Sequence, residues 1–180
     1  MPTSRSILAG AAGAGAASLA ARGPAHAHED TAIGQAVAEL VRRSEDANAA
    51  LMRGDINGYR ALVPHADDYT LMSPFGGTPT HGSDLSEERW EAVGRFFRNG
   101  TFEQELVQTY GSADMVVLAM LERCRVEVGG LPTQEWLLRV TLVYRREGSD
   151  WQLVHRHADP LVKGITLEQA AALADGASTN

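Results

Sequence analysis

The chain has 180 residues, of which 44% are hydrophobic and 22% are charged, and its formal net charge is −7. This length suits a single domain with one core and is too short for two ordinary domains. The chain is acidic and has no Lys- and Arg-rich runs interleaved with aromatic residues, which argues against nucleic acid as a partner. The single cysteine, Cys124, excludes an intrachain disulfide and a zinc site built from several cysteines.

Residues 1–27 have the composition of an export signal. Arg5 precedes a weakly apolar stretch rich in Ala and Gly, and the segment ends in the small-residue site Ala25-His26-Ala27. The stretch is too short and too rich in Gly to remain in a bilayer as a spanning helix. We therefore expect a periplasmic or secreted protein without stable membrane insertion. A disordered Ala/Gly tail or a misplaced start codon would explain the same composition.

The following residues predict three helices. From 33 to 53, apolar residues recur mainly at intervals of three and four, which is the stripe of a helix that packs on one face. Gly54 suits the left-handed position after that helix, and Asp55 can cap a short second helix through Leu62. A third helix is expected from about 86 to 99, with one face formed by Trp90, Val93 and Phe97.

The rest of the domain predicts strands. Residues 69–73 alternate as in a short strand that Pro74 must end. Four further strands are expected, at about 101–110, 113–128, 133–146 and 151–158. The turn-rich joints "VGGLP" and "EGSD" imply antiparallel neighbours. Helices that precede a meander indicate an α+β domain over 28–165, followed by a C-terminal helix or tail over 166–180.

Three stretches carry a family resemblance: "ADDYTLMSPFGGTPTHG", "RFFRNG" and "YRREGSDWQLVHRHADPLV". Together they resemble the ketosteroid isomerase and SnoaL-like family, whose fold is shared with nuclear transport factor 2. The similarity spans about residues 33–162. It implies a cone-shaped, curved antiparallel sheet wrapped around the N-terminal helix, three to four helices, and an apolar cavity open at one end. It also implies a homodimer, a small-molecule ligand and no cofactor.

The catalytic groups of the ketosteroid isomerases are absent from this sequence. Ser73 stands where the resemblance places their general-base Asp, Ala47 where it places their oxyanion-holding Tyr, and Thr141 near their protonated Asp. Without these groups, the protein cannot use the proton-transfer mechanism of the ketosteroid isomerases. Steroid isomerisation is therefore not expected.

In the family that this sequence resembles, alternate side chains of each strand face the cavity, and this strand parity gives candidate cavity residues. It points Tyr69, Arg139 and Arg156 into the cone. A charged Arg in an apolar cavity is costly unless a polar or anionic group meets it. Arg139 or Arg156 would therefore bind a substrate oxygen or a buried carboxylate, unless it sits in water at the rim. The expected substrate-binding residues are Asn48, Leu71, Ser73, Trp90, Phe97, Thr141 and Arg156.

Tyr69, Arg139 and His157 are the catalytic candidates. Tyr69 could donate a hydrogen bond or a proton, or serve only in packing. His157 could act as a base near neutral pH. It alternates with His155 on a face that the family parity turns away from the cavity, and a bulge or a one-residue slip would reverse that facing. No arrangement of His with further ligands predicts a metal site.

These observations favour a cofactor-independent lyase or isomerase that acts on a small, largely apolar, oxygenated molecule, which could be aromatic or polycyclic. The density of proton-active and cationic groups on the inward faces supports this hypothesis. The alternative is a non-catalytic periplasmic small-molecule-binding or scaffold protein of the same fold, which the missing carboxylate base favours. Both functions are implied mainly by the resemblance in fold.

Overall fold

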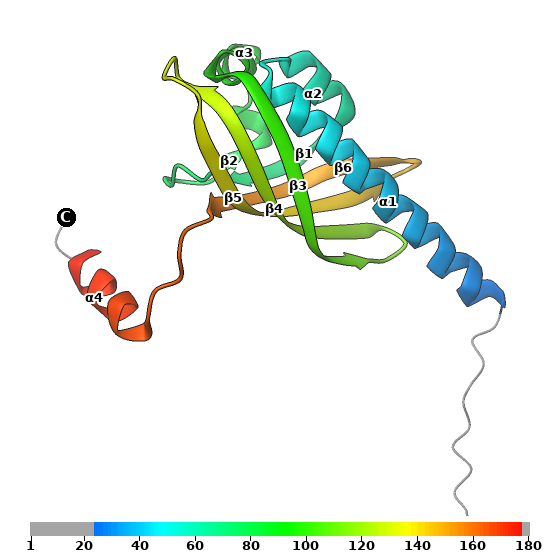
Figure 1. Ribbon diagram of the computed structural model, residues 1–180. Helices are drawn as coiled ribbons and strands as arrows, with labels where there is room; N and C mark the ends of the chain where they lie inside the picture. The colour runs from blue at the N-terminus through cyan, green and yellow to red at the C-terminus, as the bar shows by residue number, and fades with distance from the viewer. Residues whose placement is uncertain (1–23, 178–180) are drawn as a thin grey trace, which may run out of the picture.

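The structure, a computed structural model, describes residues 24–177 (Figure 1). Of the expected export signal, residues 1–23 lie outside the described part, so export stays a prediction. Within residues 24–177, no helix combines the length and the apolar character that crossing a membrane requires.

Three helices form a layer on one face of the sheet: α1 (Pro24–Met52), α2 (Ile56–Leu62) and α3 (Glu87–Phe96). The predicted boundary between α1 and α2 is confirmed. Gly54 has a φ of 85°, and the side chain of Asp55 accepts a hydrogen bond from the backbone N–H of Gly58 at 2.8 Å. The chain therefore turns sharply after α1, and α2 packs beside it.

The predicted third helix is shorter than its sequence pattern. It ends at Phe96 rather than Asn99, because Phe97 already pairs with Val128 in the sheet. Asn99 adopts a φ of 54° where the strand register shifts. Strand pairing thus replaces the last turn that the helical pattern predicted.

The sheet has six strands in the order β2-β1-β6-β5-β4-β3. Their bounds are β1 (His65–Met72), β2 (Thr80–His81), β3 (Phe97–Gly111), β4 (Met115–Val128), β5 (Gln134–Glu147) and β6 (Asp150–Pro160). The α+β class and the curved sheet against α1 are confirmed, and the two-residue β2 was not expected. The sheet is mixed rather than antiparallel throughout, because β1 and β6 pair in parallel. These strands are distant in sequence, so no turn signal determines how they pair.

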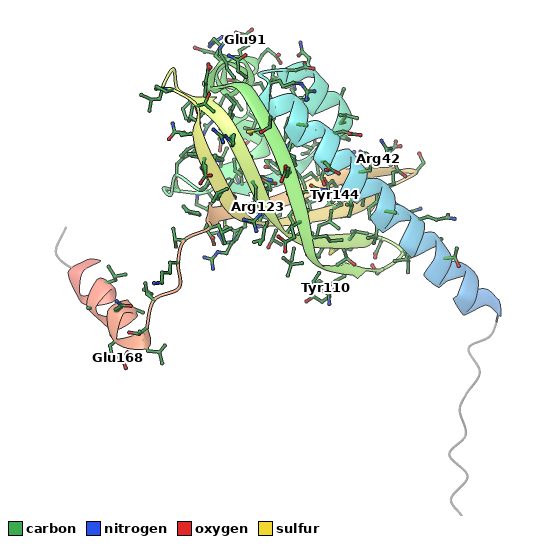
Figure 2. All side chains as sticks on the ribbon, viewed as in Figure 1. Arg42, Glu91, Tyr110, Arg123, Tyr144 and Glu168 are labelled. Atoms are coloured by element: carbon green, nitrogen blue, oxygen red, sulfur yellow. The ribbon has the colours of Figure 1, made fainter. Side chains whose placement is uncertain are left out.

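The core lies between α1 and the inner face of the sheet, which we define as the face that contacts α1. Alternate residues of β5 point into it and are buried: Leu138, Val140, Leu142 and Tyr144. Tyr144 is fully buried near α1, whereas Tyr110 is exposed at the far end of β3 (Figure 2). The predicted parity of β5 is therefore wrong. Arg139 and Thr141 alternate with the buried row and lie on the outer face.

A bulge in β6 divides that strand into two parities. Tyr144 pairs with Leu153 and Val143 pairs with His155, so Val154 is an extra residue between them. Leu153 before the bulge is buried, and after it Arg156 points inward while His155 and His157 point outward. The inward facing predicted for Arg156 is correct.

After the sheet the chain runs outward to α4 (Leu167–Ala177), which stands apart from the domain in Figure 1. This helix occupies most of the segment for which a helix or a tail was expected.

Candidate functional site

A cavity of about 410 Å³ opens between the helices and the inner face of the sheet. Its volume lies within the range of about 300–1,000 Å³ that is typical of small-molecule sites. Most of its wall is apolar, and its aromatic lining residues are Tyr59, Tyr69, Phe75, Trp90, Phe96, Phe97 and Trp136. At the mouth, Phe75 is 63% exposed, and its ring lies 5.4 Å from Trp136 and 5.7 Å from Phe96, measured between ring centroids. The cavity therefore offers flat apolar surfaces.

A buried ion pair lies at the inner end of the cavity. The guanidinium of Arg156 on β6 donates to both carboxylate oxygens of Glu122 on β4, at 2.9 and 2.7 Å. The two side chains reach across the intervening strand β5, and they are only 14% and 3% exposed respectively. Such a bidentate pair fixes the direction of its remaining donors and acceptors.

Helix α1 supplies the polar neighbour of this pair. The Asn48 amide donates to a Glu122 oxygen at 3.4 Å and to the backbone carbonyl of Ser44 at 3.0 Å. The Ser44 hydroxyl in turn donates to the carbonyl of Val41 at 2.8 Å. Ser44 and Asn48 are therefore the buried polar residues on the otherwise apolar face of α1. Asn48 lines the cavity, and Ser44 bonds to the helix backbone next to it.

The ionisation of the cavity follows from burial and charge. Burial alone lowers the pKa of Arg156, but the charge and the hydrogen bonds of Glu122 outweigh it and raise this pKa above its ordinary value. Burial raises the pKa of both Tyr59 and Tyr69. At neutral pH the site therefore holds a guanidinium and two protonated phenols, which are groups that donate hydrogen bonds.

His65 lies behind the aromatic wall rather than in the cavity. Its ring lies 4.4 Å from Tyr69 and 5.1 Å from Trp90, measured between centroids, and burial lowers its pKa to about 4. A second, more polar cavity of about 510 Å³ is lined by His65 and shares Leu85 and Trp90 with the first. His65 is consequently neutral at pH 7 and contributes to packing of the wall.

The structure brings together seven of the ten predicted site residues. The cavity is lined by Asn48, Tyr69, Leu71, Ser73, Trp90, Phe97 and Arg156. The other three, Arg139, Thr141 and His157, lie on the outer face of the sheet and do not line it. Arg139 is 59% exposed and its Nε donates to Asp159 at 2.6 Å. An outward side chain cannot meet a ligand in the cavity, so the expected cavity roles of these three residues are corrected.

Sequence reasoning missed Glu122, which supplies a buried carboxylate inside the cavity. The sequence of β4 nevertheless contains a pattern that indicates this residue. In β4 every second residue from Val116 to Val128 is buried, and Glu122 is the only charged member of that row. A charge in an inward apolar row needs a partner, and Arg156 was available two strands away.

Metal ligands do not cluster here. Within the part of the chain that the structure describes, no group of three or more His, Cys, Asp or Glu side chains is arranged to hold a metal ion.

Comparison with known families agrees with this architecture. The SnoaL-like domain family matches residues 43–162, which are 120 of the 180 residues. The chain belongs to the SnoaL-like family. A search of curated proteins finds no significant match to this SnoaL-like chain.

Solved structures share the fold of this SnoaL-like protein. A nuclear transport factor 2-like protein of unknown function from Pseudomonas putida is 26% identical, with a TM-score of 0.52 over 80% of this chain and 92% of that chain. A superfamily member from Salmonella enterica is 17% identical, with a TM-score of 0.57 over 77% and 98%. A candidate dehydratase of the same superfamily from Streptomyces avermitilis is 17% identical, with a TM-score of 0.57 over 74% and 99%.

Proposed function

We propose that this SnoaL-like protein binds a small, largely apolar, oxygen-bearing molecule in its cavity and catalyses a cofactor-independent lyase or isomerase reaction on it. The observation that carries the proposal is the buried Glu122–Arg156 pair at the inner end of an aromatic cavity. The dehydratase neighbour shares the fold alone at 17% identity, so the reaction class rests on the cavity itself.

Stability does not explain why this pair is present. Replacing a buried ion pair by apolar residues of similar volume is often neutral or stabilising by about 1–4 kcal/mol. Apolar side chains would fit here, because the neighbouring inward residues Met120, Cys124 and Leu138 are apolar and buried. A charged pair kept at the end of an apolar cavity is therefore best explained by what it does to a ligand.

The chemistry that fits this arrangement is proton abstraction beside a carbonyl group. The Glu122 carboxylate takes a proton from the carbon next to the carbonyl, and the negative charge moves to the carbonyl oxygen. Arg156 and the Tyr69 hydroxyl donate hydrogen bonds to that oxygen, and the charge lost by Glu122 reappears within reach of the same guanidinium.

The proton held by Glu122 then has two possible destinations. Return of the proton to a different carbon gives an isomerisation. In an elimination, a carbon–oxygen bond to a leaving hydroxyl breaks, and the proton joins that hydroxyl to release water. Neither outcome needs an oxidant, a reductant or a bound cofactor.

A non-catalytic binding role is the second candidate. Both oxygens of Glu122 already accept from Arg156, and one also accepts from Asn48. These hydrogen bonds occupy the carboxylate and favour a pair that only orients a ligand.

Exchange of carbon-bound protons distinguishes the two candidates without knowledge of the natural substrate. We expect the protein to accelerate deuterium incorporation next to the carbonyl of 1-tetralone in D₂O, followed by proton NMR. Glu122→Gln should lose about a hundredfold or more of the acceleration, as expected when a general base is removed. The matched control Glu105→Gln changes an exposed carboxylate that pairs with Arg123 on the outer face, and should have no effect.

Binding is measured in parallel by calorimetry. Tighter binding of 1-tetralone than of tetralin, without exchange, would favour the binding protein. Absence of binding and of exchange would contradict both candidates.

A further inference from the structure

The cavity carries one positive charge that its own lining does not balance. Of the residues that line it, Arg89, Glu122 and Arg156 are charged. Glu122 and Arg156 neutralise each other at the inner end. Arg89 is exposed on α3, so its charge lies on the solvent side of the cavity. The lining as a whole therefore has a net charge of about +1, although the chain is acidic.

We propose that the ligand is a monoanionic carboxylic acid whose carboxylate is bound by Arg89 at the mouth, while its second oxygen meets Arg156 and Glu122 inside. This inference rests on the proposed function and specifies its substrate class. The ligand is an aromatic or alicyclic keto acid, with the two polar ends separated by the apolar body that the aromatic walls cover.

The contacts around Arg89 prepare it for an anion. One of its terminal nitrogens donates to the Thr80 hydroxyl at 3.2 Å, and Thr80 also lines the cavity. Since that hydroxyl oxygen accepts from Arg89, its own proton is available to a ligand oxygen. The guanidinium fork and the hydroxyl can thus bind the two oxygens of one carboxylate together.

Two neighbouring acids on α3 are engaged elsewhere. Both oxygens of Glu87 accept from Arg60, at 2.8 and 2.9 Å, and Glu91 accepts from Arg95 at 3.3 Å. The backbone N–H of Arg89 donates to the Ser86 side chain at 3.3 Å, which fixes the first turn of the helix. Arg89 is therefore held beside the mouth, with a hydroxyl as its partner among the lining residues.

The charge balance favours a carboxylate over a phosphate monoester. A carboxylate brings a single negative charge, which one guanidinium balances. A phosphate monoester carries about −1.5 to −2 at neutral pH, and the surplus would lie against the exposed apolar ring of Phe75. General attraction of anions is also unfavourable, because the whole chain has a net charge of −7.

Calorimetry with matched ligands tests the inference. The ligands are the 6- and 7-carboxylates of 1-tetralone and the corresponding neutral carboxamides, so that shape is nearly constant and two directions toward the mouth are sampled. At low NaCl, one of the carboxylates should bind about three- to tenfold more tightly than its carboxamide, and the ratio should shrink at high NaCl.

Matched variants assign the preference to a residue. Arg89→Gln should bring the ratio of the two dissociation constants close to one. Arg95→Gln removes the same charge from the same helix, outside the cavity lining, and should leave the ratio unchanged.

A preference that survives in Arg89→Gln would overturn the inference. Tight binding of the carboxamides with no carboxylate preference in the wild type would also overturn it, while leaving the proposed function intact. Absence of binding by all four ligands and by 1-tetralone would contradict both.

Discussion

Replacing Arg156 by Met should destabilise the protein strongly, because the Glu122 carboxylate would be left buried without its counter-ion. Glu122 is 3% exposed and Arg156 is 14% exposed, so water screens the pair only weakly. Breaking such a pair from one side costs about 3–5 kcal/mol. In a chain of 180 residues, each kcal/mol lowers the melting temperature by about 2–4 °C, so the expected fall is about 6–20 °C.

The double variant Arg156→Met with Glu122→Leu removes both charges and should recover most of the lost stability. Urea unfolding of the wild type, the single variant and the double variant gives the three free energies, at constant slope against denaturant. A single variant that loses less than about 1 kcal/mol would refute the reasoning, because it would mean that water or another cation reaches Glu122. If the double variant does not regain the lost free energy of unfolding, the shapes of the two side chains, rather than their charges, are what the packing of the sheet requires.

Three further outcomes are expected. In the folded protein the pKa of His65 is lowered to about 4, whereas the unfolded chain protonates this residue below about pH 6.5. The free energy of unfolding, compared with that of His65→Phe, should therefore fall as the pH drops from 6.5 to 4. Parallel pH profiles of stability for the two proteins would contradict this. Gly100→Ala should cost about 1–3 kcal/mol, because its Cβ would lie 2.8 Å from a backbone carbonyl at the end of α1, while Gly34→Ala, with open space around it, should gain about 0.5–1 kcal/mol in urea unfolding. Arg139→Met changes only the outer face and should leave proton exchange in 1-tetralone unaltered. A loss of exchange would mean that Arg139 takes part in the reaction after all.

Local signals predicted the elements of this fold well. Gly54 and Asp55 separate α1 from α2 because a left-handed residue and a side-chain cap act within a few residues. The parallel pairing of β1 with β6 was not predictable in this way, since it depends on where the whole intervening chain returns.

The sequence of β5 alone indicates which of its side chains face the core, whereas the assignment taken from the family resemblance was wrong. From Trp136 to Tyr144 the row that includes Leu138 is apolar, whereas the other row contains Arg139 and Thr141 in its middle. Hydrophobic alternation alone assigns the first row to the core. The same test applied to β4 would have identified Glu122 as a charge in an inward row.

The bulge in β6 marks a limit of sequence reasoning. It reverses facing between Leu153 and His155, and its position is set by pairing with β5 rather than by any residue preference in the strand. Arg156 was assigned correctly, but its partnership with Glu122 joins strands separated by β5 and required the folded sheet.

The central claim is that the cavity binds an oxygen-bearing apolar molecule with its oxygen at the Glu122–Arg156 pair. A crystal structure of the protein soaked with 1-tetralone tests it most directly. The claim predicts ring density between the aromatic walls, with the carbonyl oxygen within hydrogen-bond distance of the Arg156 guanidinium or the Tyr69 hydroxyl. A ring bound with its carbonyl directed to the mouth beside Phe75, or bound only on the outer face of the sheet, would contradict it.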